Sequence, residues 1–345
     1  MHTPAVEANT VLLAKNGEET GKQIFGLYGL AQGAEDLKDY SLHFDLTVPF
    51  ARYVLDRESE LTFPFKRYQI QPVRRGERAQ KGRFREFFQC DIDVIWRKDS
   101  NHSYLYYDAE VIFTLSQTLQ HILTTMAIED TPVMHISNRK LLVGFLRSLI
   151  SESEVPVVSS LIDKYQKIGQ DTFIASLGDL GLYPEVVQKI LDFITMKVDK
   201  DSLQKVATLA DTPLFQEGLN ELKEVVSLLE TFQSSCSQTC PYVIDFQIIR
   251  GLDYYTGTVF EGMLQNDASL GAISAGGRYG ELTGYIDAKR DDFAGVGGTL
   301  GLSRLLAKIF DEQTSSHNTV SEYLFVNFPE TLDTTLTLAT KLQSE

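Results

Sequence analysis

Two spacings of apolar residues alternate along the chain and predict strand-rich regions on either side of a helical middle. Residues from about 41 to 137 alternate short strand-like runs with one stripe near 103–125, where apolar residues recur at helical spacing. Strand-like patterning returns with the run 242–249. The glycine-rich run 295–301 then leads into a predicted helix over 302–310. This order predicts an α+β fold.

The middle of the chain, from about 139 to 232, is predicted to be helical. Apolar residues form one helical stripe over 141–150 and another over 186–194, and Pro184 stands where the second helix would begin. We therefore expect a first core part at 1–137, a helical insertion at 138–236, a second core part at 237–312, and the start of a C-terminal domain at 321–345, with one strand near 322–328 and one helix near 335–344.

A dense basic segment, residues 66–88, lies between two of the strand-like runs. It holds eight of the chain's 32 basic residues and only two acids, Glu77 and Glu86, although the whole chain carries a net charge of -15. In an acidic protein, such a concentration of basic residues in one hairpin indicates a local binding site for phosphates or a polyanion. An exposed, charged hairpin with no ligand is the alternative that this segment alone leaves open.

The strand that leaves this hairpin has two unlike faces, because successive side chains of a strand point to opposite sides. The polar face carries an aromatic ring, an amide and two carboxylates, from Phe87, Gln89, Asp91 and Asp93. The other face is apolar enough to lie on a core and carries Phe88, Cys90, Ile92, Val94 and Trp96. The polar face suits a substrate with a flat ring, a phosphate and a cationic group.

Composition excludes several classes of protein. No apolar run approaches the roughly 20 residues of a membrane helix, and the start of the chain lacks the features of a signal peptide, so we expect a cytoplasmic protein. Three cysteines make a disulfide framework improbable, and Cys236 and Cys240 have no histidine nearby that could complete a zinc site. We expect no protein-bound metal site.

Four ordered blocks resemble a known family. Residues 66–89 resemble motif 2 of the class II aminoacyl-tRNA synthetases, and 45–52, 250–257 and 275–279 resemble further blocks of histidyl-tRNA synthetase in its eukaryotic, archaeal and Bacteroidetes-like form. The resemblance implies a catalytic core with a mainly antiparallel sheet, a helical insertion and a fragment of an α/β anticodon-binding domain. Because the family is longer at both ends, we expect the natural protein to extend beyond this sequence.

The resemblance also implies a reaction and its participants. The expected activity is ATP-dependent ligation of histidine to tRNA(His) through a histidyl-adenylate, with ATP and Mg2+ required and a homodimer as the working form. Implied catalytic residues are Arg75 and Arg250. Implied ATP-binding residues are Arg75, Glu77, Arg83, Phe87 and Arg304. Implied histidine-binding residues are Asp45, Thr47, Gln89, Asp93, Tyr254, Tyr255, Tyr279 and Gly276, with Asp93 and Tyr255 at the imidazole.

Three positions depart from the family pattern: His43, Gly280 and Ser303 stand where arginine, aspartate and glutamate are usual. They leave open whether the chain is a specialised paralogue. The main alternative is a binding protein that does not charge tRNA, the regulatory subunit of ATP phosphoribosyltransferase, which shares the core fold. A second alternative is a synthetase-like sensor of uncharged tRNA.

Overall fold

The computed structural model describes residues 1–14, 21, 23–27, 29, 39–76, 78, 83–99, 104–249, 254–267, 270–312 and 332–343. The chain divides into two compact units, Met1–Lys308 and Ile309–Glu345. In the second unit the structure describes the end of α11 (Leu302–Glu312) and α12 (Leu332–Gln343). The strand expected near 322–328 lies outside the described residues.

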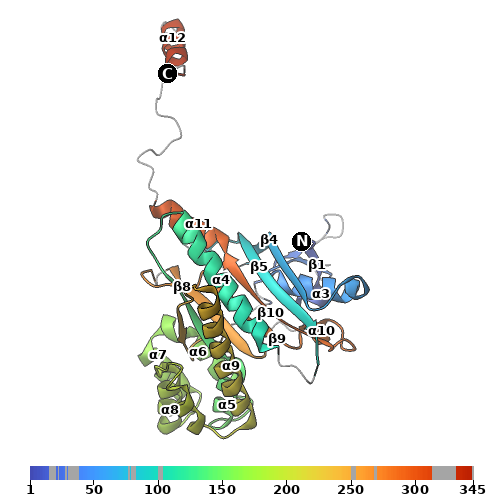
Figure 1. The fold of residues 1–345 in the computed structure, drawn as a ribbon, viewed down its shortest axis with the longest axis vertical. Helices are drawn as coiled ribbons and strands as arrows, with labels where there is room; N and C mark the ends of the chain where they lie inside the picture. Colours follow the sequence, from blue (N-terminus) through green and yellow to red (C-terminus); the bar gives the residue numbers. More distant parts are fainter. Residues whose placement is uncertain are drawn as a thin grey trace. The chain divides into compact units, whose positions relative to one another are not determined.

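A seven-stranded sheet forms the centre of the first unit (Figure 1). Its order is β4 (Phe65–Arg74), β5 (Glu86–Arg97), β10 (Phe293–Gly301), β9 (Ser274–Tyr279), β8 (Thr258–Leu264), β6 (Pro132–Asn138) and β7 (Tyr242–Ile244). Neighbouring strands are antiparallel except β6 and β7, which are parallel. The predicted α+β fold with a mainly antiparallel sheet is confirmed.

Helices cover the sheet and extend from it. The long helix α4 (Leu105–Thr125) crosses the sheet, and α3 (Thr47–Arg57), the 3-10 turn η2 (Glu58–Glu60) and α10 (Leu282–Ile286) lie toward the β4 end (Figure 1). Near the N-terminus, β1 (Val6–Ala8), β3 (Tyr40–Leu42) and β2 (Gly26–Leu27) form a small sheet beside α1 (Asn9–Leu12). The helix predicted near 103–125 is confirmed as α4.

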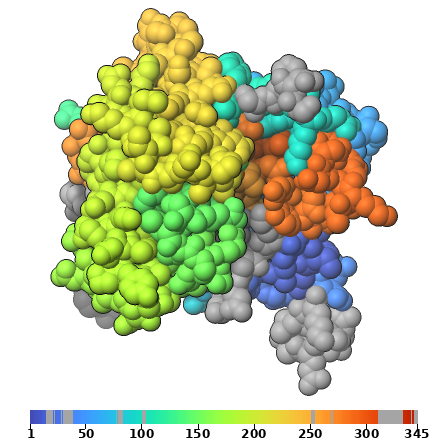
Figure 2. Space-filling view, turned by 90° about the horizontal axis from the view of Figure 1, so that it is seen from below, coloured from blue at the N-terminus to red at the C-terminus, as the bar shows by residue number. Residues whose placement is uncertain are grey.

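The helical segment consists of α5 (Arg139–Arg147), α6 (Val155–Ile168), α7 (Gln170–Asp179), α8 (Pro184–Thr195), the 3-10 turn η3 (Leu203–Thr208) and α9 (Pro213–Cys236). It forms one side of the first unit, coloured green to yellow in Figure 2. Glycines let α5 and α9 cross closely: a Cβ on Gly218 would lie 2.3 Å from the Leu141 nitrogen, and one on Gly144 2.4 Å from the Phe215 nitrogen. Only glycine fits at such a crossing.

Aromatic stacking joins this helical segment to the sheet. The ring of Phe193 on α8 stacks on Phe145 of α5 at 4.1 Å and on Phe246, just after β7, at 4.7 Å. All three rings are buried. Stacked pairs of this kind stabilise beyond the area they bury, so the helical segment and the sheet share a core.

Two expectations about strands need correction. The strand expected over 242–249 ends at Ile244, because Asp245 turns the backbone: its side chain accepts the Gln247 amide at 3.0 Å and its carbonyl accepts the Ile248 amide at 3.2 Å. The apolar face of β5 is buried only toward its end, and Phe88 is 48% exposed. The polar face is the more buried one over Gln89–Asp93.

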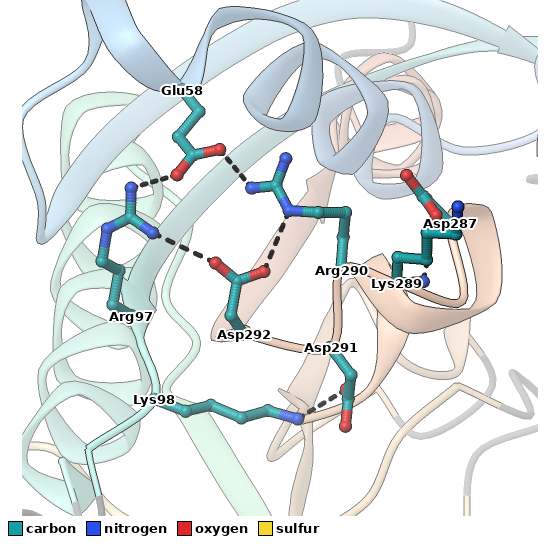
Figure 3. Close-up of polar contacts among 8 residues, drawn as sticks. All are labelled: Glu58, Arg97, Lys98, Asp287, Lys289, Arg290, Asp291 and Asp292. Carbon is teal, nitrogen blue, oxygen red and sulfur yellow. Dashed lines mark hydrogen bonds and ion pairs between the residues drawn. The ribbon is translucent and has the colours of Figure 1, made fainter.

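A closed ring of ion pairs fastens the sheet end opposite the hairpin (Figure 3). Arg97 and Arg290 each form ion pairs with both Glu58 and Asp292. The distance to the Asp292 carboxylate is 3.1 Å from Arg97 and 3.3 Å from Arg290. Lys98 pairs with Asp291 at 2.6 Å. The ring joins the residues after α3 to the end of β5 and the start of β10, so three distant segments are held at one corner.

Candidate active site

A cleft of about 740 Å³ opens on the polar face of the sheet, between the β4–β5 hairpin and the helical segment. Most of the predicted site residues that the structure describes line it: Asp45, Thr47, Arg75, Arg83, Phe87, Gln89, Tyr254, Tyr255 and Arg304. They come from segments far apart in the sequence. Two predicted residues, Glu77 and Arg250, lie outside the described residues.

One end of the cleft is basic and aromatic. The Arg75 guanidinium lies 5.2 Å from the centre of the Phe87 ring, and its Nε donates a hydrogen bond to the Phe44 carbonyl at 3.0 Å. Arg304, in the first turn of α11, donates to the Ala272 carbonyl at 2.5 Å. These contacts fix two arginines and one flat ring around the same space, which suits a planar base linked to phosphates.

The other end of the cleft is acidic and buried. Asp45, two residues before the start of α3, accepts hydrogen bonds from the Val48 amide at 3.2 Å and from the Tyr254 hydroxyl at 3.0 Å. Burial raises the pKa of Asp45 to about 6, against the opposing effect of these hydrogen bonds and of Arg75. A carboxylate whose charge burial disfavours is stabilised by a cationic ligand.

Asp93 is placed behind the cleft wall. Its carboxylate pairs with Arg67 at 2.7 Å and accepts the Tyr279 hydroxyl at 2.8 Å, and both side chains of the ion pair are almost fully buried. Neither Asp93 nor Tyr279 lines the cleft. In the described structure, therefore, the partner of Asp93 is Arg67. A direct contact of Asp93 with an imidazole remains a prediction.

Arg67 was not expected at the site. It also donates to Gln69 at 2.5 Å and to the Leu46 carbonyl at 3.1 Å, and it lies 4.3 Å above the Phe50 ring. The polar alternation of Arg67, Gln69 and Gln71 along β4 was the available signal. The register that sets Arg67 opposite Asp93 could have been found only from the strand pairing.

Gly276 packs against neighbouring parts of the protein and does not line the cleft. A Cβ there would fall 2.2 Å from the Gly297 carbonyl and 2.4 Å from the Phe260 ring, so the residue permits close packing of β9 on β10. Gly297 in turn leaves room for Asp93, because its Cβ would lie 2.0 Å from the Asp93 carboxylate. Gly276 was expected to let a ligand approach the backbone closely. Among the described residues, the groups that approach it closely are β10 and the Phe260 ring.

The helical segment supplies a wall of the cleft that sequence reasoning missed. Helix α6 contributes Ile162, Asp163, Lys164, Gln166 and Lys167 to the lining. Gln166 donates to Gln247 at 3.1 Å, which ties α6 to the residues after β7. The sequence predicted a helical middle of the chain but did not single out this helix, and it gave no signal that α6 faces the cleft.

Each departure from the family pattern is accommodated by a local contact. His43 is buried, its Nε2 lies 2.8 Å from the Pro72 carbonyl, and burial lowers its pKa. The Ser303 hydroxyl accepts the Phe88 amide at 2.9 Å. The Gly280 amide donates to the Thr256 hydroxyl at 2.8 Å. None of these three residues lines the cleft.

The antiparallel sheet, the arginine-bearing hairpin and the two-ended cleft define the catalytic core of a class II aminoacyl-tRNA synthetase. The sequence model of a protein family described as histidyl-tRNA synthetase matches residues 1–305 of the chain. The chain belongs to the histidyl-tRNA synthetase family.

Individual relatives agree with this assignment. The chain is 41% identical over 350 residues to histidine–tRNA ligase of Clostridium tetani, covering 99% of this chain and 75% of that protein. It is 42% identical over 322 residues to the ligase of Stenotrophomonas maltophilia, covering 88% and 67%. The crystal structure of histidyl-tRNA synthetase from Nostoc sp. PCC 7120 matches with a TM-score of 0.73 at 35% identity, covering 100% of this chain and 75% of that one.

A more distant structure shares the fold. The crystal structure titled ATP phosphoribosyltransferase regulatory subunit/histidyl-tRNA synthetase, from Bacillus halodurans C, matches with a TM-score of 0.70 at 20% identity, covering 100% of this chain and 81% of that one. At this identity the likeness concerns the fold alone.

Proposed function

We propose that the chain catalyses ATP-dependent ligation of histidine to tRNA(His) through a histidyl-adenylate. The observation that carries this proposal is the polarity of one cleft. Its basic, aromatic end (Arg75, Phe87 and Arg304) suits a nucleotide, and its buried acidic end (Asp45) suits an amino group. The two ends face one space, which brings the reacting groups together.

The first step joins the histidine carboxylate to the α-phosphorus of ATP and releases pyrophosphate. Negative charge is carried by the oxygens of the α-phosphate and of the leaving pyrophosphate as the new bond forms and the old one breaks, and preorganised cations stabilise it. Arg75 is held for this role by its bond to Phe44 and by the neighbouring Phe87 ring. We assign Arg75 to the α-phosphate and carboxylate, Arg304 and Arg83 to the nucleotide, and Phe87 to the adenine. The nucleotide is taken as its magnesium complex, so the metal enters with the substrate.

The roles of Arg250, the second catalytic arginine, and of Glu77, the adenine contact, are assigned from the sequence alone. Arg250 is assigned to the reacting phosphate and Glu77 to the adenine amine by their places in the family blocks. Both lie outside the described residues. Ile248 and Tyr254, which precede and follow Arg250 in the chain, line the cleft. Gly76, next to Glu77, donates its amide to the carbonyl of Gln23, which also lines the cleft.

The acidic end is assigned to histidine. Asp45, Thr47 and Gln89 serve the α-amino group, Tyr254 and Tyr255 wall the pocket, and Tyr279 and Gly276 support that wall from behind. Asp93 and Tyr255 are the proposed partners of the imidazole. A site that hydrogen-bonds its ligand in a buried position rejects a wrong side chain, because polar groups would be left unpaired.

The further partners are tRNA(His) and a second copy of the chain. Lys164 and Lys167 on α6 give the cleft a basic wall, which supports entry of a phosphate backbone. Tyr68, Ile70 and Phe88 are 68%, 44% and 48% exposed on adjacent strands, and such a patch supports a protein interface. We place the activity in the cytoplasm, where tRNA charging serves protein synthesis.

In the part of the chain that the structure describes, no helix is long and apolar enough to cross a membrane. The alternative of a regulatory subunit rests on a likeness of fold alone and does not account for the arginines that line the cleft, Arg75, Arg78, Arg83 and Arg304. The decisive experiment is histidine-dependent exchange of labelled pyrophosphate into ATP with magnesium, with Arg75→Ala as the inactive control. We expect exchange from the wild type only. A wild-type protein that binds histidine and ATP yet gives no exchange would refute the proposal.

A further inference from the structure

Two buried acceptors lie side by side on the wall of the cleft. Gln89 and Asp91 occupy successive positions on the polar face of β5, are 5% and 4% exposed, and both line the cleft. The side-chain oxygens Gln89 Oε1 and Asp91 Oδ1 have no hydrogen-bond partner among the described residues. Buried acceptors in native proteins are nearly always paired, so these two oxygens point to a ligand that donates hydrogen bonds to them.

The charges around these two oxygens favour a cationic donor. Asp45, Asp91 and Asp93 are three buried carboxylates whose charges influence one another. Arg67 is the buried cation among them, and its ion pair is made to Asp93. Asp45 has the Val48 amide and the Tyr254 hydroxyl. Asp91 is left facing the cleft with one oxygen unpaired, so a cation placed there would relieve an unfavourable burial of charge.

We propose that Asp91, together with Gln89 and beside Asp45, binds the α-ammonium group of histidine and is a second carboxylate that selects ligands bearing this cation. The inference rests on the proposed function and adds a binding residue to it. An ammonium group has three N–H bonds, and the orphaned oxygens of Gln89 and Asp91 offer two acceptors beside the buried Asp45. The hydroxyl of Thr299 on β10, directly opposite in the strand register, steadies the Asp91 carboxylate.

Three ligands separate the ammonium from the ring and the carboxylate: histidine, histidinol, which lacks the carboxylate, and imidazolepropionic acid, which lacks the amine. Calorimetry of each against Asp91→Asn should show histidine and histidinol weakened by about 10- to 100-fold, the value of a hydrogen bond to a charged group. Imidazolepropionic acid and ATP should bind as to the wild type. Asp179→Asn removes an exposed carboxylate from α7, outside the cleft lining, and should leave every affinity unchanged.

The outcomes distinguish the inference from the function on which it rests. If the wild type binds no histidine, the proposed function fails. If the wild type binds histidine and exchanges pyrophosphate, yet Asp91→Asn leaves histidine binding unchanged, the inference alone is overturned. Equal weakening of histidine and imidazolepropionic acid would also overturn it, because Asp91 would then serve the ring.

A measurement on the wild type covers the case in which Asp91→Asn does not fold. Burial raises the pKa of Asp91 to about 7, opposed by Arg67 and Thr299 and reinforced by Asp93 and Asp45. The ratio of affinities for histidine and imidazolepropionic acid isolates the ammonium group once each affinity is corrected for the ring titration of the free ligand, because the ammonium group lowers the ring pKa of histidine. This ratio should rise by up to about tenfold between pH 6 and 8, as Asp91 ionises, and then level off. A flat ratio would refute the proposal.

Discussion

Removing the charge of Asp91 should stabilise the unliganded protein relative to the wild type, and this difference should grow as the pH rises. Burial raises the pKa of this carboxyl from 3.8 to about 7 in the folded chain, so folding favours its protonated form. The stability linked to the protonated group is present below pH 4 and is lost as the pH rises through about 7. Asp91→Asn keeps the shape of the side chain without the charge, so the variant should not lose this stability as the pH rises.

The size of the effect follows from the two pKa values. A shift of about 3 units corresponds to a penalty on the order of 4 kcal/mol once the group is ionised in both states. The penalty is only partly developed at pH 5 and almost complete at pH 8. The difference in the free energy of unfolding between Asp91→Asn and wild type should therefore grow by about 2 to 3 kcal/mol between these pH values.

Urea unfolding followed by circular dichroism at pH 5 and pH 8 measures this difference directly. Any constant cost of the asparagine amide cancels, because only the change with pH is compared. Asp163→Asn removes the same charge from an exposed position on α6 and should give a difference that does not vary with pH. If the Asp91→Asn difference is equally constant, Asp91 is not a penalised buried carboxylate and the reasoning is wrong.

Three further predictions concern the ring, the ion pair and the helix crossing. Phe87→Ala should weaken ATP by about 1 to 3 kcal/mol, as expected for a lost stacking partner, with histidine binding intact; calorimetry with both ligands checks this. Asp93→Ala should lower the free energy of unfolding by about 3 to 5 kcal/mol, because it strands the buried charge of Arg67, and Arg67→Met added to it should restore most of the loss in urea. Gly218→Ala should cost about 1 to 3 kcal/mol where α9 meets α5, whereas Gly178→Ala, with open space around it, should leave thermal stability unchanged or raised.

The sequence by itself determined the order of elements and named nine of the residues that line the cleft. The helical stripe near 103–125 became α4, Pro184 begins α8, and the glycine-rich run before residue 302 became β10 leading into α11. These features follow from local rules: side-chain periodicity, the fixed φ of proline, and glycine where strands pack closely. Period two along β5 likewise placed Phe87, Gln89, Asp91 and Asp93 on one face.

Only the tertiary structure decided how deep each of these residues lies and what it contacts. Periodicity assigns a side chain to a face, but its depth depends on what packs over that face. Arg67 is brought opposite Asp93 by the pairing of β4 with β5, which withdraws Asp93 from the cleft and leaves Asp91 facing it. Helix α6 reaches the cleft through the packing of the helical segment on the sheet. Contacts between residues so distant in the chain depend on the packing of whole elements, and no local pattern encodes that packing.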